Sequence, residues 1–173
     1  MLVVKEHSSP NYSPRTYYNA KSADITLAFA MDFNTAGEKL TKKASYPSYL
    51  SLDLREDWIV NARLVYKEVK SSGARTLNIA GNGIYTLSKY GMDQDAANKY
   101  VYDCLRKVHE YYALTKIYTG GQTGVDLAGA IAGYNLGIDT EVTLPKGFIM
   151  RFEDGKDISM TKEQVENLIM GKV

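Results

Sequence analysis

Residues 117–126 have the sequence IYTGGQTGVD, and this stretch decides the fold that we expect. It joins the apolar run LTKIYTGG (114–121) to an Ala- and Gly-rich segment at 125–136, in the order strand, glycine turn, helix. Glycine permits positive φ and lets another group approach the backbone closely. The first amides of a helix have no partner inside the helix, and the helix dipole adds partial positive charge there. The junction therefore predicts a site for a phosphate or another anion.

The same alternation continues on both sides of this stretch. Strands are expected at 25–33, 76–84 and 140–145, helices at 51–74 (capped by Asp53), 93–112 and 162–170, and a short helix or an ordered loop at 34–45. Strands that alternate with helices are typical of βαβ units. The predicted fold class is α/β: one Rossmann-like three-layer domain with a mostly parallel sheet over residues 25–173. Residues 1–24, rich in Ser, Pro, Tyr and Asn, are expected to form an irregular N-terminal arm.

A second glycine loop, AGNGIYTL (80–87), follows another predicted strand. The carboxyl ends of parallel strands meet at one edge, where ligands of such folds bind. Neither loop is a Walker A loop or a complete dinucleotide fingerprint, which argues against ATP hydrolysis and ordinary dehydrogenase chemistry. Lys146 is expected to contact a phosphate as a point charge. The predicted ligand-binding residues are Gly81, Asn82, Gly83, Thr119, Gly120, Gly121, Gln122, Thr123, Gly124 and Lys146.

Composition excludes several other classes of protein. The single cysteine, Cys104, cannot form an internal disulfide or a cysteine zinc site, and His7 and His109 are too far apart to suggest a metal site. No metal and no cofactor are expected. A net charge of +1 provides no broad field for nucleic acid. No apolar run reaches the roughly 18 residues that span a bilayer, and the N-terminus lacks a signal-peptide core, so a cytoplasmic protein is expected.

Residues 120–158, GGQTGVDLAGAIAGYNLGIDTEVTLPKGFIMRFEDGKDI, resemble the glycine-rich signature of the YpsA-type and molybdenum-carrier-like families of the SLOG superfamily. The resemblance lies in the GGQTGVD block, the Ala-rich segment after it, Pro-Lys-Gly at 145–147 and Glu-Asp-Gly at 153–155, and it does not extend to residues 1–70. It implies a Rossmann-like fold with a nucleotide or NAD-derived ligand at the glycine loop. The related LOG phosphoribohydrolases carry a Pro-Gly-Gly-x-Gly-Thr-x-x-Glu block, and this chain lacks both its leading proline and its glutamate.

Three carboxylates are candidates for chemistry on such a ligand. Cleavage of an N-glycosidic bond needs a carboxylate near the ribose C1′ or near an attacking water. Asp32 and Glu38 lie in DFNTAGEKLTKKA (32–44), which follows a predicted strand, and Asp126 belongs to the glycine block. We expect the neighbouring lysines to keep Glu38 ionised as a base or nucleophile. Asp126 is expected to orient a ribose hydroxyl or to cap the helix.

The leading hypothesis is a protein that binds a nucleotide or ADP-ribose-like ligand at the glycine loops and cleaves its N-glycosidic bond. One alternative is a non-catalytic sensor or sequestering protein for a nucleotide signal. Another is a nucleic-acid binder similar to the SLOG protein DprA, which the near-neutral charge disfavours. A carboxylate from segment 32–38 beside the ligand favours the enzyme, and a carboxylate-poor pocket favours sequestration. The Tyr-rich amphipathic helix at 93–112 suggests a homodimer.

Overall fold

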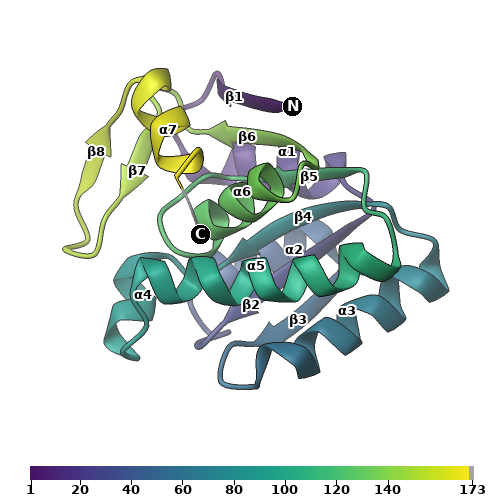
Figure 1. Ribbon diagram of the computed structural model, residues 1–173. Coiled ribbons are helices and arrows are strands. Elements are labelled where there is room, and N and C mark those ends of the chain that lie inside the picture. Colours follow the sequence, from purple (N-terminus) through teal and green to yellow (C-terminus); the bar gives the residue numbers. More distant parts are fainter. Residues whose placement is uncertain (172–173) are drawn as a thin grey trace.

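The computed structural model describes residues 1–171 and shows a Rossmann-like three-layer α/β architecture (Figure 1). Its centre is a six-stranded, all-parallel sheet with the strand order β1-β6-β5-β4-β2-β3. The strands of this sheet are β1 (Leu2–Glu6), β2 (Ile25–Ala30), β3 (Tyr49–Asp53), β4 (Thr76–Gly81), β5 (Lys116–Thr119) and β6 (Asp139–Leu144). The predicted fold class is therefore confirmed.

Seven helices and one hairpin complete the described part of the chain. The helices are α1 (Tyr12–Ser22), α2 (Ala36–Ser45), α3 (Trp58–Ser72), α4 (Ile84–Lys89), α5 (Gln94–Tyr111), α6 (Val125–Asn135) and α7 (Lys162–Ile169). Strands β7 (Ile149–Arg151) and β8 (Asp157–Ser159) form a separate antiparallel hairpin. None of these helices is long and apolar enough to cross a membrane.

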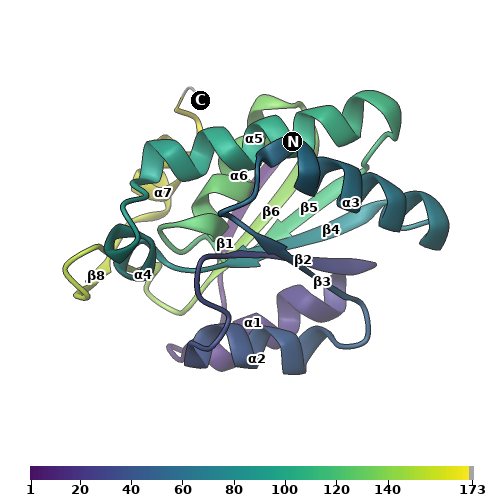
Figure 2. The same cartoon turned by 90° about the horizontal axis from the view of Figure 1, so that it is seen from below.

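The two faces of the sheet differ in chemistry. Helices α1 and α2 cover one face, and α3, α5 and α6 cover the other (Figure 2). Side chains of a strand alternate between the faces, and the large apolar residues of β2 and β4, such as Phe29 and Ile79, pack with α3, α5 and α6 in the main core. The opposite face has small or polar residues, among them Thr26, Ala28 and Asn78. Within residues 1–171, neither hydrophobic cluster includes a residue of α1 or α2.

The expectation of an irregular arm at residues 1–24 is wrong. Strand β1 pairs in parallel with β6 at the edge of the sheet, and α1 packs against α2. The reason is that the buried face of α1 is mostly polar: its buried residues are Arg15, Asn19 and the small residue Ala20. A search for apolar periodicity does not detect such a helix. Pro14 fits because it lies in the first turn, where a backbone N–H would have no hydrogen-bond partner inside the helix.

Helices α2, α3 and α5 agree only in part with what was expected from the sequence. The helix expected at 51–74 is strand β3 followed by α3, and Asp57 caps that helix in place of Asp53. Residues 36–45 form a true helix, α2, which Thr35 caps through a bond from the Glu38 amide. Helix α5 occurs as predicted. Its apolar face, including Leu105, lies in the core, so a homodimer cannot form through that face.

Candidate functional site

The two glycine loops meet at the carboxyl edge of the sheet, as expected from the parallel order. The Ile84 amide donates to the Thr123 carbonyl at 3.2 Å, and the Val125 amide donates to the Asn82 carbonyl at 3.1 Å. Gly124 adopts a φ of 97°, and a Cβ there would approach the backbone of the other loop closely. Glycine is required at Gly124 because the two loops pack backbone to backbone.

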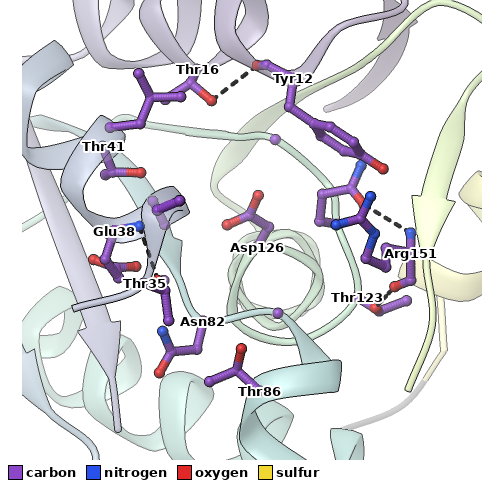
Figure 3. A pocket seen from close by; sticks show the side chains of 18 of the residues that line it. Tyr12, Thr16, Thr35, Glu38, Thr41, Asn82, Thr86, Thr123, Asp126 and Arg151 are labelled. Carbon is purple, nitrogen blue, oxygen red and sulfur yellow. Dashed lines mark hydrogen bonds between the residues drawn. The ribbon is translucent and has the colours of Figure 1, made fainter. Parts of the chain in front are cut away.

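A cavity of about 440 Å³ lies between these loops and helices α1 and α2 (Figure 3). Its volume falls within the range of about 300–1,000 Å³ that is typical of small-molecule sites. It exists because the sheet face under α1 and α2 has small and polar side chains that do not fill the layer. The side chains and backbone groups that define it include Tyr12, Arg15, Asn19, Glu38, Thr41, Asn78, Asn82, Gly120, Thr123, Asp126 and Arg151.

A buried ion pair lines this cavity. Arg15 Nη1 donates to Asp126 Oδ2 at 3.4 Å, and both side chains are about nine-tenths buried. Burial raises the pKa of Asp126 to about 6, while Arg15 and the backbone amides of Gln122 and Gly81 act in the opposite direction. Burial also lowers the pKa of Arg15, although Asp126 partly offsets this effect. Asp126 therefore keeps a proton until higher pH than an ordinary aspartate.

Gly120 makes room for this ion pair. A Cβ on Gly120 would coincide with the Arg15 guanidinium and would lie 2.6 Å from Asp126 Oδ2. Gly121 faces the other way, because its Cβ would lie 2.5 Å from a Val142 methyl group and would contact Leu144. Gly120 is thus the glycine at which an added side chain would disturb the cavity, whereas a side chain on Gly121 would disturb the core.

Glu38 faces Asp126 across the cavity from helix α2 (Figure 3). The residue is 2% exposed, and Oε2 has no hydrogen-bond partner among residues 1–171. Burial, and next the charge of Asp126, raise the pKa of Glu38 to about 8. The expectation that lysines keep Glu38 ionised is therefore wrong. The neighbouring residues Lys39, Lys42 and Lys43 are exposed to solvent, so their charges do not offset the burial of the carboxyl group.

Asp32, the third candidate carboxylate, does not line the cavity. Its Oδ1 accepts from the Asn34 amide at 2.8 Å and closes a local turn. Asn82, from the predicted ligand-binding set, braces the same segment: Oδ1 accepts from the amides of Met31 and Asp32, and Nδ2 donates to the Asp32 carbonyl. Asn82 therefore fixes the position of the segment that leads to α2 and to Glu38.

The glycine block uses several of its donors inside the protein. The Gly124 amide donates to Gln94 Oε1 at 2.6 Å, and the Leu127 amide donates to the Gln122 carbonyl at 2.8 Å. Gln122 and Gly81 place backbone amides near the Asp126 carboxylate. The negative group that these loops hold in this structure is thus the Asp126 carboxylate. Lys146, expected at a phosphate, is exposed and does not line the cavity.

The β7–β8 hairpin forms the mouth of the cavity. Gln122 anchors it, because Nε2 donates to the Ile149 carbonyl at 2.7 Å and Oε1 accepts from the Arg151 amide at 2.9 Å. Thr123 Oγ1 also donates to the Arg151 carbonyl. The Arg151 side chain binds Asp157 through two nitrogens, and the Tyr12 hydroxyl donates to the same carboxylate at 3.0 Å. Tyr12 and Arg151 therefore connect α1 to the hairpin.

Four of the polar residues in the cavity were not expected from the sequence: Tyr12, Arg15, Asn19 and Asn78. Tyr12, Arg15 and Asn19 lie at spacings of three and four residues on α1, so they share one face of the helix. A periodicity search on polar residues would have detected this face.

The fold and the site together define a Rossmann-like α/β protein with a polar cavity at the carboxyl edge of its sheet and two carboxylates inside it. No family model matches the sequence, and no curated protein matches it either.

Proposed function

We propose that this protein binds a nucleotide or ADP-ribose-like ligand in the cavity and hydrolyses its N-glycosidic bond. One observation carries the proposal: Glu38 and Asp126, from two different helices, line the same buried cavity. Segment 32–38 thus contributes a carboxylate to the site, which favours a hydrolase over a sequestering protein. The cytoplasmic location expected from the sequence remains part of the proposal.

The protonation states of the two carboxyl groups divide their roles. At neutral pH a group with a pKa of about 8 is mostly protonated, so Glu38 can donate a proton to the departing base. Asp126, with a pKa of about 6, is mostly ionised. Pairs of acids whose pKa values differ in this way are typical of acid and base partners in catalysis.

The hydrolysis balances with these two groups and one water molecule. The water oxygen forms a bond to the ribose C1′ while the bond from C1′ to the base nitrogen breaks. Asp126 takes a proton from the water and stabilises the positive charge that develops on the ribose ring. Glu38 gives its proton to the base, and proton exchange with solvent restores both carboxyl groups. Arg15 holds Asp126 in place through the bond at 3.4 Å.

The test is hydrolysis of AMP, CMP, NAD and cyclic ADP-ribose, with chromatography to detect the free base from the first three compounds and the ring-opened product from cyclic ADP-ribose. We expect turnover of at least one compound, and we expect Glu38→Gln and Asp126→Asn to reduce it by about 10²–10⁴-fold, the usual contribution of an acid or base. Asp32→Asn is the matched control: it changes a carboxylate of the same segment outside the cavity, and it should retain wild-type turnover.

Two results would contradict the proposal in different ways. Tight binding of one compound without any turnover would show a sensor or sequestering protein. Turnover that survives both Glu38→Gln and Asp126→Asn would leave a hydrolase with other catalytic residues.

A further inference from the structure

Helix α1 and strand β4 both line the cavity along its depth. Helix α1 begins at the mouth with Tyr12, and Asn19, seven residues later, lies about 10 Å deeper at 1.5 Å per residue. Strand β4 runs toward the same edge, so Asn78 lies about 13 Å below Asn82 at roughly 3.3 Å per residue. Asn19 and Asn78 thus lie at the inner end of the cavity.

The carboxylates lie between this inner end and the mouth. Arg15, which binds Asp126, is located between Tyr12 and Asn19 on α1. With the glycosidic bond at the level of Asp126, one half of the ligand occupies the inner end of the cavity and the other half occupies the mouth. Among the described residues that line the cavity, the two cationic side chains are Arg15 at mid-depth and Arg151 at the mouth. The phosphate therefore suits the mouth, and the uncharged base suits the inner end.

Asn19 and Asn78 have hydrogen-bonding capacity that the protein does not use. Asn19 is 2% exposed, and neither Oδ1 nor Nδ2 has a partner within residues 1–171. Asn78 is 3% exposed, and its Nδ2 donates to Thr26 Oγ1 at 3.1 Å. With Nδ2 bonded to Thr26, the atom of the Asn78 amide that has no partner within residues 1–171 is Oδ1, an acceptor. Buried polar groups are normally hydrogen-bonded, so three such atoms at one end of a cavity indicate a polar ligand.

We propose that Asn19 and Asn78 recognise the base and select one that has an exocyclic amino group beside a ring nitrogen, as adenine and cytosine have. The amino group donates to Asn78 Oδ1 and to Asn19 Oδ1, and the ring nitrogen accepts from Asn19 Nδ2. A carbonyl in place of the amino group would put an oxygen against Asn78 Oδ1. This inference rests on the proposed function, because it requires a nucleotide in the cavity.

Matched ligands test this selectivity directly. AMP and IMP differ at the position where an amino group is replaced by a carbonyl, and CMP and UMP differ in the same way. Calorimetry on the wild-type protein should give binding about 10-fold or more tighter for AMP than for IMP, the discrimination of one good amide–base pair. The affinity for CMP should exceed the affinity for UMP by a similar factor. Chromatography of each sample records whether the ligand stays intact.

Two variants separate recognition of the base from general effects on the fold. Asn19→Leu should weaken AMP binding by about 10-fold and bring the AMP and IMP affinities close together. Thr143→Val is the matched control, because Thr143 is 2% exposed, its Oγ1 also lacks a partner within residues 1–171, and it does not line the cavity. It should leave both affinities unchanged. Asn19→Ser replaces Asn19→Leu if the leucine variant does not fold.

The outcomes distinguish this inference from the proposed function. Equal affinity of the wild type for AMP and IMP, or an AMP preference that survives Asn19→Leu, overturns the base assignment and leaves nucleotide binding in place. Selective binding of AMP and CMP without turnover supports the base assignment and contradicts the hydrolase. Failure to bind any of the four nucleotides overturns the base assignment, and the proposed function falls with it only if NAD and cyclic ADP-ribose are not hydrolysed either.

Discussion

Replacement of Glu38 by glutamine should make the protein more stable at high pH. Burial raises the pKa of Glu38 from 4.5 to about 8, so the folded state holds a proton that the unfolded state releases. A raised folded pKa gives stability that is complete below pH 4.5 and is lost as the pH rises through 8. A glutamine side chain is neutral at every pH and has the shape of the protonated acid. The variant should therefore avoid this loss.

The size of the effect follows from the shift. A change of one in a pKa corresponds to about 1.4 kcal/mol of free energy. The change in the Glu38 pKa from 4.5 to about 8 therefore sets an upper bound of about 5 kcal/mol on the stability lost by pH 9. Because water can enter the cavity and solvate the ionised acid, we expect a gain of about 3 kcal/mol for Glu38→Gln at pH 9. At pH 5, where Glu38 is protonated in the folded protein, the variant should differ from wild type by less than about 1 kcal/mol.

The assay is urea unfolding of both proteins at pH 5, 7 and 9. Glu56→Gln is the control, because Glu56 is exposed and its carboxylate has no hydrogen bond or ion pair among residues 1–171. The difference between this control and wild type should stay constant with pH. A Glu38→Gln protein that is less stable than wild type at pH 9, or whose advantage does not grow with pH, would refute the assignment of Glu38 as a buried neutral acid.

Three further predictions concern the cavity and the core. The rate of base release should be bell-shaped in pH, rising through about 6 as Asp126 ionises and falling through about 8 as Glu38 loses its proton, and a rate that is flat from pH 5 to 9 would contradict the two roles. Gly120→Ala should abolish turnover and lower the free energy of unfolding by about 2–4 kcal/mol, because the new Cβ displaces a buried guanidinium. Gly37→Ala is the control: a Cβ there has no neighbouring atom of residues 1–171 within 4 Å, so thermal unfolding should show a neutral or slightly stabilising change. Burial raises the pKa of the Cys104 thiol, so a thiol reagent should modify it only in denaturant, and fast labelling of the native protein would show that the core opens.

Much of the fold was predictable because one face of the sheet follows the usual pattern. The strands β2, β4 and β5 are short apolar runs, and α5 has an apolar face at helical spacing, so periodicity located them. The chain between residues 1 and 24 was not predictable in this way. Helix α1 covers a polar sheet face and buries Arg15 and Asn19, a pattern that apolar periodicity does not register. The short strand β3 was missed because only four residues separate its end from the start of α3.

The candidate site was predictable where a residue belonged to a recognisable loop. Asp126 and Glu38 follow strand ends, so the rule for parallel sheets placed them at one edge, and both line the cavity. Their electrostatics were not predictable from neighbours in the sequence. The three lysines near Glu38 point to solvent, and the cation that pairs with Asp126 is Arg15, 111 residues away. Partners at that separation are known only once the helices are placed on the sheet.

The two faces of the sheet divide stability and chemistry between them. Helices α3, α5 and α6 bury the large apolar residues, so that layer supplies most of the hydrophobic stabilisation. The layer of α1 and α2 instead depends on polar contacts such as Lys5 Nζ to Tyr18 Oη at 2.6 Å, and on a cavity with unpartnered buried groups. A ligand that satisfies those groups adds contacts that the protein alone lacks, and it therefore stabilises α1 and α2 more than the rest of the fold. Conservative changes in the main core should accordingly alter stability more than chemistry, whereas changes under α1 and α2 should do the reverse.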